Sequence, residues 1–189
     1  MKKKETISEN WQSPSPFEAL VAEREFAEKI KDKVFYAGVF VNREELYDKT
    51  GAKLKNTVEK PHVTTNFQPN ETQLHLDSLG SGVRIFAIGY GNNGKNEGLL
   101  VKVVAEDPEI QTAIDKIEKP HITLSSSEDS HPMYTPEALG LDDEGNPVKG
   151  FRAFGEDEQF EIDGKYGLYM KKDDAVVEDR NTLENYLDD

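Results

Sequence analysis

Two segments of the chain repeat the same residue types at the same spacing. Residues 58–65 read VEKPHVTT, and residues 117–124 read IEKPHITL. Each copy places a histidine and a threonine two positions apart, after an identical Glu-Lys-Pro. An imidazole takes or gives a proton near neutral pH, and a hydroxyl donates hydrogen bonds to phosphate oxygens. Two such pairs around one cleft would suit acid–base chemistry on a phosphodiester.

The spacing has a geometric meaning if both segments are strands, because side chains two residues apart point to the same face. His62 then projects together with Thr64, and His121 together with Thr123, while the hydrophobic residue between them faces the buried side. One neutral imidazole would take a proton from an attacking water or hydroxyl. The other, as imidazolium, would give a proton to the departing oxygen. These four residues are the predicted catalytic set, and the chemistry requires no metal or other cofactor.

Local signals predict the elements that carry the two segments. Ser15, Asn42 and Asp107 are suitable N-cap residues, each followed by a helix-forming stretch. The predicted elements are a helix after Ser15, a strand at 34–41, a short helix from Asn42 to Gly51, strands at 61–67, 82–90 and 98–105, a helix after Asp107, a strand at 120–126, and two strands within 160–170 around an Asp163-Gly164 turn. The apolar residues that the first helix is expected to bury are Phe17, Leu20, Val21 and Ile30.

The same order of elements occurs twice. A strand, a short helix and a Pro-His-x-Thr strand follow one another at 34–67 and again at 98–126. A strand–helix–strand unit predicts parallel neighbouring strands joined by a right-handed crossover. Two such units facing each other would bring the two histidine strands together. The sequence therefore predicts an α/β (α+β) fold with two lobes, related by a pseudo-two-fold axis and flanked by helices.

The chain is expected to form one domain with loose ends. Residues 1–14 are predicted to be a flexible tail, residues 15–172 the folded domain, and residues 173–189 an acidic tail with a marginal helix near Leu183. Within the domain, residues 127–155 are predicted to be rich in loops. A single domain of this length is long enough to bury a sizeable core.

Composition and charge exclude several classes of function. The chain has no cysteine, so disulfides and thiolate metal sites are excluded. Its formal charge of −14 disfavours duplex DNA as a partner. There is no apolar stretch of about 20 residues for a membrane span, and no apolar run follows the basic start, so we expect a soluble cytoplasmic protein without a membrane partner. The lysines that precede the two histidines predict either a solvated surface or a small positive zone for one phosphate group; they are Lys49, Lys53, Lys55, Lys60, Lys116 and Lys119.

Other interpretations of the histidines are open at this point. A single histidine on a strand is more often a structural residue than a catalyst. A structural duplication would explain the repeat, although it gives little reason to keep both polar residues on the less apolar face. Zinc binding by the two histidines, with His75 or His131 as a further ligand, is a third interpretation. Neither His75 nor His131 has the close ligand spacing of a structural zinc site, and we expect both to lie in exposed loops.

The paired motifs, HVTT at 62–65 and HITL at 121–124, resemble those of the 2H phosphoesterase superfamily. The resemblance covers roughly residues 34–170. It implies metal-independent catalysis on 2′,3′-cyclic phosphates, ADP-ribose 1″,2″-cyclic phosphate, 2′-5′ oligonucleotides or related cyclic nucleotides, with two histidines as the acid–base pair and two threonines holding the phosphate. One departure is Thr65, which stands where the first motif usually has a hydrophobic residue; we expect its hydroxyl to bond to the backbone.

The sequence therefore predicts a metal-independent phosphodiesterase that hydrolyses the cyclic phosphate of a nucleotide or an RNA end. The alternatives are a non-catalytic protein that binds or sequesters such ligands, and a decoy protein of viral origin. Four aromatic residues are candidates for stacking on a base, and each is also a candidate core residue. They are Tyr36, Phe67, Tyr166 and Tyr169.

Overall fold

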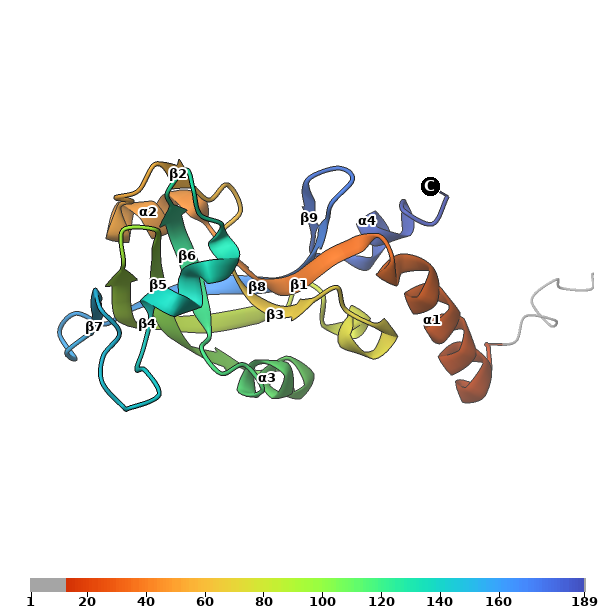
Figure 1. Ribbon diagram of the computed structural model, residues 1–189. Coiled ribbons are helices and arrows are strands. Elements are labelled where there is room, and N and C mark those ends of the chain that lie inside the picture. The colour runs from red at the N-terminus through yellow and green to blue at the C-terminus, as the bar shows by residue number, and fades with distance from the viewer. Residues whose placement is uncertain (1–12, 189) are drawn as a thin grey trace, which may run out of the picture.

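The structure is a computed structural model that describes residues 13–188, so most of the predicted N-terminal tail lies outside the described residues. It has a mixed α and β architecture built on one nine-stranded sheet (Figure 1). The helices are α1 (Pro16–Lys31), α2 (Arg43–Thr50), α3 (Pro108–Asp115) and α4 (Arg180–Glu184), with short 3-10 segments η2 (Glu71–Gln73), η3 (Leu76–Ser78) and η4 (Pro132–Ala138). The strands are β1 (Val34–Val41), β2 (Asn56–Thr57), β3 (His62–Phe67), β4 (Gly82–Asn92), β5 (Asn96–Ala105), β6 (His121–Ser126), β7 (Phe151–Ala153), β8 (Phe160–Met170) and β9 (Ala175–Val177).

All the strand pairs are antiparallel, so the predicted parallel crossovers are wrong. The sheet order is β2-β6-β5-β4-β8-β1-β3, with β7 on β4 and β9 on β8. The last residues of β1 pair with the first residues of β3, and β5 pairs with β6 in the same antiparallel sense. An eight-residue helix rises only about 12 Å, whereas β1 spans about 26 Å. The connecting helices α2 and α3 therefore turn the chain at a strand end and do not carry it back along the strand.

The two histidine strands are held by their neighbours in the same register. In both pairs a glycine lies opposite the motif threonine, and the ladder shifts by one residue immediately beyond that threonine. The matched partners are Gly38↔Thr64, Val39↔Val63 and Phe40↔His62 in the first pair, and Gly98↔Thr123, Leu99↔Ile122 and Leu100↔His121 in the second. Each motif is thus presented by the same local backbone frame.

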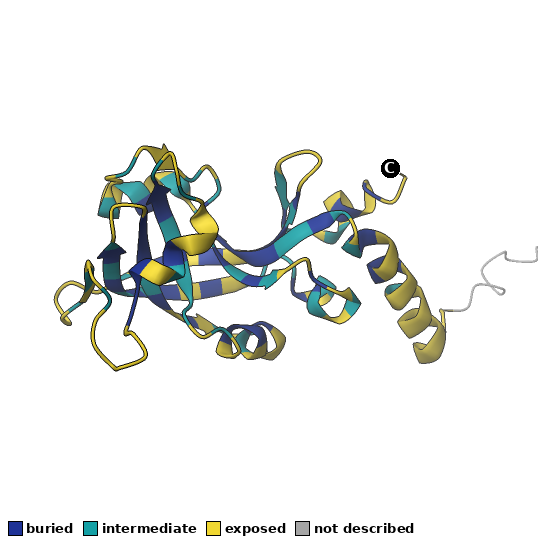
Figure 2. Cartoon of the chain, in the orientation of Figure 1, coloured by how far each residue is buried: buried dark blue, intermediate teal, exposed yellow. Residues whose placement is uncertain are grey.

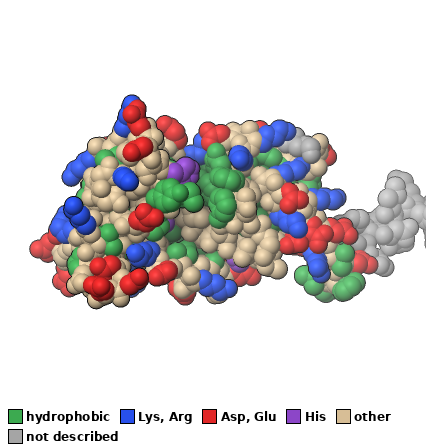
Figure 3. Space-filling view, in the orientation of Figure 1, with side chains coloured by type: hydrophobic (Ala, Val, Ile, Leu, Met, Phe, Trp, Pro, Cys, Tyr) green, Lys and Arg blue, Asp and Glu red, His purple; other side chains and the backbone are tan. Residues whose placement is uncertain are grey.

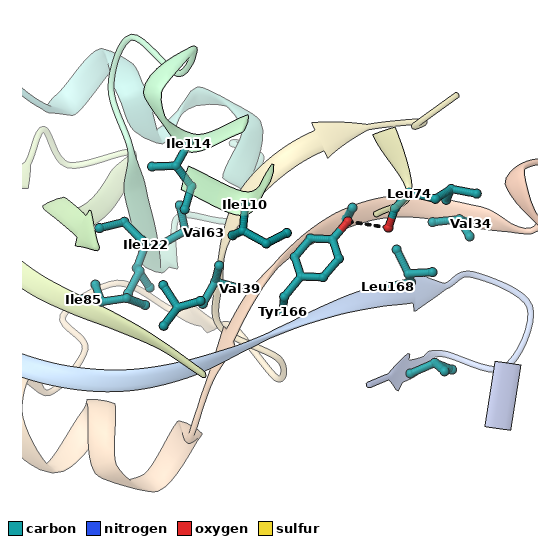
Figure 4. Close-up of a cluster of buried hydrophobic side chains, with 14 of the residues drawn as sticks. Val34, Val39, Val63, Leu74, Ile85, Ile110, Ile114, Ile122, Tyr166 and Leu168 are labelled. Carbon is teal, nitrogen blue, oxygen red and sulfur yellow. Dashed lines mark hydrogen bonds between the residues drawn. The ribbon is translucent and has the colours of Figure 1, made fainter. Parts of the chain in front are cut away.

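The hydrophobic core joins the two motif strands from behind. Val63 is 1% exposed and Ile122 is 0% exposed, and both belong to one cluster. Figure 4 shows them close together, with Ile110 and Ile114 of α3 beside them. β3 and β6 contact each other although they share no ladder. Because the residues between each histidine and threonine lie in this common core, the polar pairs project away from it.

The predicted helix starts are confirmed. Ser15 and Glu18 form a capping box at the start of α1, and Asn42 and Asp107 accept backbone hydrogen bonds at the starts of α2 and α3. Gly51 ends α2, as expected. These signals are local, because a side-chain oxygen satisfies N–H groups two or three residues further on. They could therefore be found without knowledge of the tertiary structure.

The predicted turn at Asp163-Gly164 is wrong, because β8 continues unbroken from Phe160 to Met170. Gly164 pairs with β1 on one side and with β4 on the other. A Cβ added to it would lie 2.5 Å from Val39 Cγ1. The glycine permits close packing across the sheet and does not mark a turn.

The predicted apolar stripe of α1 is also largely wrong. Phe17 is 74% exposed, Leu20 is 68% exposed and Val21 is 40% exposed, whereas Ile30 is fully buried. Figures 1 and 2 show the reason: the first turns of α1 extend away from the body, and burial begins only near its C-terminal end. Phe26 and Ala27, which were not predicted, complete the buried face.

The C-terminal segment, expected to be an acidic tail, contains two packed elements. β9 pairs with the end of β8, and α4 buries Leu183 completely. The predicted marginal helix near Leu183 is therefore present as α4. Within residues 13–188, no helix combines the length and the apolar character needed to cross a bilayer.

Candidate functional site

The two motif histidines have the same hydrogen-bonding pattern. His62 Nδ1 lies 2.8 Å from the carbonyl oxygen of Lys60, and His121 Nδ1 lies 2.8 Å from that of Lys119. A carbonyl oxygen only accepts hydrogen bonds, so each Nδ1 carries the proton and donates it. In the neutral ring the other nitrogen, Nε2, is then unprotonated. Each histidine is oriented by its own backbone and keeps one nitrogen for proton transfer.

The pKa of each motif histidine lies below its ordinary value. Burial is the main cause that lowers the pKa of His62 to about 4, and the charge of His121 lowers it further. Burial also lowers the pKa of His121. Both effects follow from the cost of placing a cation away from water or beside another cation. The two histidines lie on strands that contact each other, β3 and β6. Figure 3 shows a histidine side chain at the surface near the middle of the molecule, between groups of hydrophobic side chains.

His62 packs against aromatic rings. Its ring stacks on Tyr36 with centroids 4.4 Å apart and planes at 20°, and it lies 5.3 Å from the ring of Phe40. The residue opposite His121 on the neighbouring strand is Leu100, where His62 has Phe40. The two halves of the site therefore share a backbone frame but differ in side-chain environment.

The motif threonines lie beside their histidines. Thr64 and Thr123 are both half-buried, and the residues directly before and after each of them in the sequence are buried. Thr123 Oγ1 donates a 2.8 Å hydrogen bond to Thr135 Oγ1, and Asn96 Nδ2 lies 3.4 Å from the same oxygen. Thr135 comes from η4 and is fully buried. Sequence reasoning missed Thr135 and Asn96, because no local pattern connects the loop-rich segment 127–155 to β6.

Three of the four predicted aromatic contacts gather on the His62 side. Tyr36 also stacks on Tyr169, at 4.8 Å and 12°. Because β1 lies between β3 and β8 in the sheet, protein rings cover both faces of Tyr36. Phe67 is 62% exposed and pairs with Tyr36 across the ladder. Phe67 is thus the exposed ring of the three, Tyr169 is half-buried, and Tyr36 lies between Tyr169 and His62.

Tyr166 does not belong to this group. It is fully buried, and its hydroxyl donates a 2.7 Å hydrogen bond to the carbonyl oxygen of Leu74. Figure 4 shows this bond within the hydrophobic cluster. Burial raises the pKa of the Tyr166 hydroxyl well above its usual range. The prediction that Tyr166 contacts a ligand is therefore replaced by a role in the core.

The lysines nearest the histidines are engaged by other groups. Lys60 Nζ lies 3.2 Å from Asp174 Oδ1, and the Tyr169 hydroxyl donates a 2.6 Å hydrogen bond to the same carboxylate. These contacts keep the pKa of Asp174 below its ordinary value. Lys119 Nζ donates to the carbonyl oxygen of Leu139 at 3.0 Å. Lys60 therefore contacts the β8–β9 connection and Lys119 contacts the end of η4, and both also contribute positive charge.

Thr65 departs from the expectation made for it. Its side chain is buried, and its Oγ1 has no hydrogen-bond partner among the described residues. The neighbouring Asn66 Oδ1 is in the same situation within the described part of the chain. Both residues lie where the β1–β3 ladder shifts register, immediately beyond Thr64. The corresponding position in β6 is Leu124, which is fully buried without any polar atom in its side chain.

The other two histidines have separate surroundings. His75 Nδ1 lies 3.4 Å from Glu109 Oε2, and His131 Nδ1 accepts a hydrogen bond from the backbone of Met133 at the start of η4. Residues 13–188 contain no cluster of three or more histidine, aspartate or glutamate side chains arranged to hold a metal ion. The zinc interpretation, with His75 or His131 as a further ligand, therefore has no geometric support in the described residues.

No protein-family model matches the chain, and no curated protein matches it in sequence.

Proposed function

We propose that the protein is a phosphodiesterase that opens a cyclic phosphate, such as a 2′,3′-cyclic phosphate of a nucleotide or an RNA end. The observation that carries the proposal is the pair of histidines on β3 and β6, two strands that contact each other without pairing. Each donates Nδ1–H to its own backbone and thereby keeps Nε2 for proton transfer. Each has a threonine on the same face of its strand. Acid–base chemistry on a phosphate ester uses these groups in this arrangement.

The reaction balances without a further reactant. Water attacks phosphorus while the neutral imidazole of one histidine takes a proton from it. The bond between phosphorus and one ribose oxygen breaks, and the imidazolium of the other histidine gives its proton to that oxygen. The product is a phosphomonoester with a free hydroxyl, and one proton has moved between the histidines. Thr64 donates a hydrogen bond to a non-bridging oxygen, where negative charge increases in the transition state. Thr123 does the same once the Thr135 hydroxyl becomes the donor in the bond between the two threonines, which frees the Thr123 proton for the phosphate.

A bound phosphate offsets the effect of burial on the histidines. An anion between the rings favours the protonated form of either imidazole and so raises the pKa that burial lowers. The unliganded site therefore holds two mostly neutral rings at neutral pH. Binding of the anionic substrate itself then promotes uptake of the one proton that the reaction requires.

The fold supports the proposed resemblance to 2H phosphoesterases. The matched registers of β1–β3 and β5–β6, each with a glycine opposite the motif threonine, are what a pseudo-two-fold relation between two lobes would produce. We assign the relation to residues 34–67 and 98–126, where the motifs repeat. The formal charge of −14 favours a small nucleotide or a single RNA end over a long polyanion.

Hydrolysis of 2′,3′-cyclic nucleotides in the presence of EDTA tests the proposal. We expect turnover that survives EDTA and falls by at least about 100-fold in His62→Ala and in His121→Ala, because each removes an acid or base. His75→Asn is the matched control, since it removes a histidine outside the pair at a left-handed position that asparagine tolerates. Turnover that EDTA abolishes, or that persists in both alanine variants, would contradict the proposal.

The second candidate function is a binding protein that holds the same ligand without cleaving it. The lowered pKa of both histidines favours this candidate, because a pair of neutral rings lacks a proton donor. Calorimetry with a 2′,3′-cyclic nucleotide, followed by analysis of the recovered ligand, separates the two functions. Stoichiometric binding with the ligand intact after hours indicates sequestration, whereas a phosphomonoester product indicates hydrolysis.

A further inference from the structure

The two histidines differ in what covers them, although their backbone frames match. Phe40 lies opposite His62, while Leu100 lies opposite His121. Directly opposed residues of an antiparallel pair place their side chains on the same face, within contact distance. Tyr36, on the same strand as Phe40, adds a second ring at 4.4 Å from the imidazole. We call Tyr36 and Phe40 the aromatic pair.

The aromatic pair is itself held in place. Tyr36 and Phe40 stack on each other at 6.0 Å and 21°, and Tyr169 stacks on Tyr36 at 4.8 Å. Phe40 is 7% exposed and so cannot turn away from the imidazole without leaving the packed interior. Rings fixed in this way keep water from the part of the His62 ring that they cover, while the residue as a whole stays partly exposed. A charged imidazole loses hydration there, while a neutral imidazole stacks on the rings at little cost.

The charged and titratable groups around His62 do not reverse this effect. From β6 it faces His121, which in its protonated form disfavours a positive charge on His62. From β1 and β8 it faces the phenols of Tyr36 and, behind it, Tyr169, both of which have a raised pKa and are neutral at physiological pH. The nearby Lys60 and Asp174 form an ion pair with each other. Nothing in these elements supplies His62 with a carboxylate partner of its own.

We propose that the aromatic pair makes the histidines inequivalent, so that His62 is the proton acceptor of the site and His121 is the proton donor. Tyr36 and Phe40 act as positioning residues, because they act through His62 and not on the substrate. This assignment rests on the proposed function for its catalytic meaning. The order in which the two rings take up a proton is a property of the free protein and does not depend on any substrate.

In the reaction, His62 then takes the proton from the attacking water, and His121, protonated when the anion binds, gives its proton to the departing ribose oxygen. The phosphorus–oxygen bond to that ribose oxygen breaks as the bond to the water oxygen forms. The site returns to its starting state when His62 releases a proton to solvent and His121 takes one up. Burial of His62 favours the release, because its charged form is the less stable of the two.

Titration of the four histidines by NMR tests the assignment directly. We expect His62 to take up its proton at lower pH than His121 in the unliganded protein. Tyr36→Ala should raise the titration midpoint of His62 by about one pH unit through hydration, with little change at His121. Phe17→Ala is the control, because it removes an exposed aromatic ring of α1 that is not part of this stack.

A reciprocal variant keeps the test informative if Tyr36→Ala fails to fold. Leu100→Phe places a ring opposite His121, where β1 has Phe40 opposite His62. It should lower the titration midpoint of His121 and leave that of His62 in place. Equal midpoints in the wild-type protein, a higher midpoint for His62, or equal shifts of both rings in these variants would overturn the proposal.

The same variants connect the assignment to catalysis. If the enzyme turns over, Tyr36→Ala should move the acidic limb of the pH–rate profile to higher pH, and Leu100→Phe should move the basic limb to lower pH. A role in folding alone would scale the whole profile without moving either limb. If neither the wild-type protein nor any variant shows turnover, the proposed function fails. The order in which His62 and His121 titrate by NMR still tests whether the aromatic pair makes the two histidines inequivalent.

Discussion

Thr123 Oγ1 donates a 2.8 Å hydrogen bond to Thr135 Oγ1, which joins the motif threonine of β6 to a fully buried residue of η4. Asn96 Nδ2 lies 3.4 Å from the same Thr135 oxygen and also donates to the carbonyl oxygen of His131. The hydroxyl of Thr123 is therefore oriented by a short buried network. Such networks polarise their members and fix their geometry.

The first prediction concerns Thr135. Thr135→Val keeps the shape of the side chain but removes the hydroxyl that orients Thr123. We expect kcat/KM for a 2′,3′-cyclic nucleotide to fall about tenfold, the equivalent of one hydrogen bond. Thr135→Ser, which keeps the hydroxyl, should restore most of the activity. Equal activity in the valine and wild-type proteins would show that Thr123 needs no orientation by η4.

The second prediction concerns the glycines opposite the motif threonines. A Cβ at Gly38 would lie 2.5 Å from the carbonyl oxygen of Val63, and a Cβ at Gly98 would lie 2.9 Å from that of Ile122. Gly38→Ala and Gly98→Ala should each lower the free energy of unfolding by about 2 kcal/mol, because backbone must move. Gly82→Ala is the control, since a Cβ there meets nothing within 4 Å. Urea denaturation measures all three, and a neutral Gly38→Ala would contradict the close approach of the two strands.

The parts of the fold that could be predicted from sequence are those with local causes. The caps at Asn42 and Asp107 satisfy donors within the same turn, and the alternation around His62 and His121 sets one buried face per strand. Pairing direction has no such local signal. A strand–helix–strand pattern is compatible with parallel or antiparallel neighbours, and only the short helices and the sheet order decide between them.

In the candidate site, too, features with local causes could be predicted from the sequence, whereas tertiary contacts could not. The histidine and threonine of each motif could be predicted because two copies of a short pattern define them. Thr135 could not, because its contact with Thr123 joins η4 to β6 through tertiary packing. Tyr166 and Tyr169 are three residues apart on β8. Tyr166 lies in the core, whereas Tyr169 stacks on Tyr36. Aromatic type alone does not distinguish a buried ring from one that faces a ligand.

The third prediction concerns Thr65, whose buried hydroxyl has no hydrogen-bond partner among the described residues. A buried polar group without a partner costs about 1–3 kcal/mol. Thr65→Val removes the hydroxyl and preserves the shape, so we expect it to raise the free energy of unfolding by about 1 kcal/mol. Thr64→Val, one residue away on the other face, should bring no such gain and should weaken catalysis. A loss of stability in Thr65→Val would mean that the hydroxyl is satisfied in solution.

The fourth prediction concerns the pH dependence of stability. The pKa of His62 is about 4 in the folded protein, compared with an ordinary value of 6.5, which applies to the unfolded chain. Between these values the unfolded chain binds a proton that the folded protein does not, so the free energy of unfolding falls as the pH decreases. When the pH falls from 7.5 to 5.5, His62 alone should lower the free energy of unfolding by about 1 kcal/mol.

A glutamine variant isolates this contribution, because glutamine cannot titrate. Urea denaturation of the wild-type protein and of His62→Gln is measured at the two pH values. On acidification, the free energy of unfolding of the variant should fall by about 1 kcal/mol less than that of the wild-type protein. Both pH values lie above the isoelectric point of about 4.7, so the protein keeps its negative charge throughout. Tyr36→Ala should reduce the loss in the same direction, since hydration of the ring lets the folded protein bind the proton as well. Equal losses in the wild-type and glutamine proteins would mean that His62 is accessible to water and that the aromatic pair does not control its protonation.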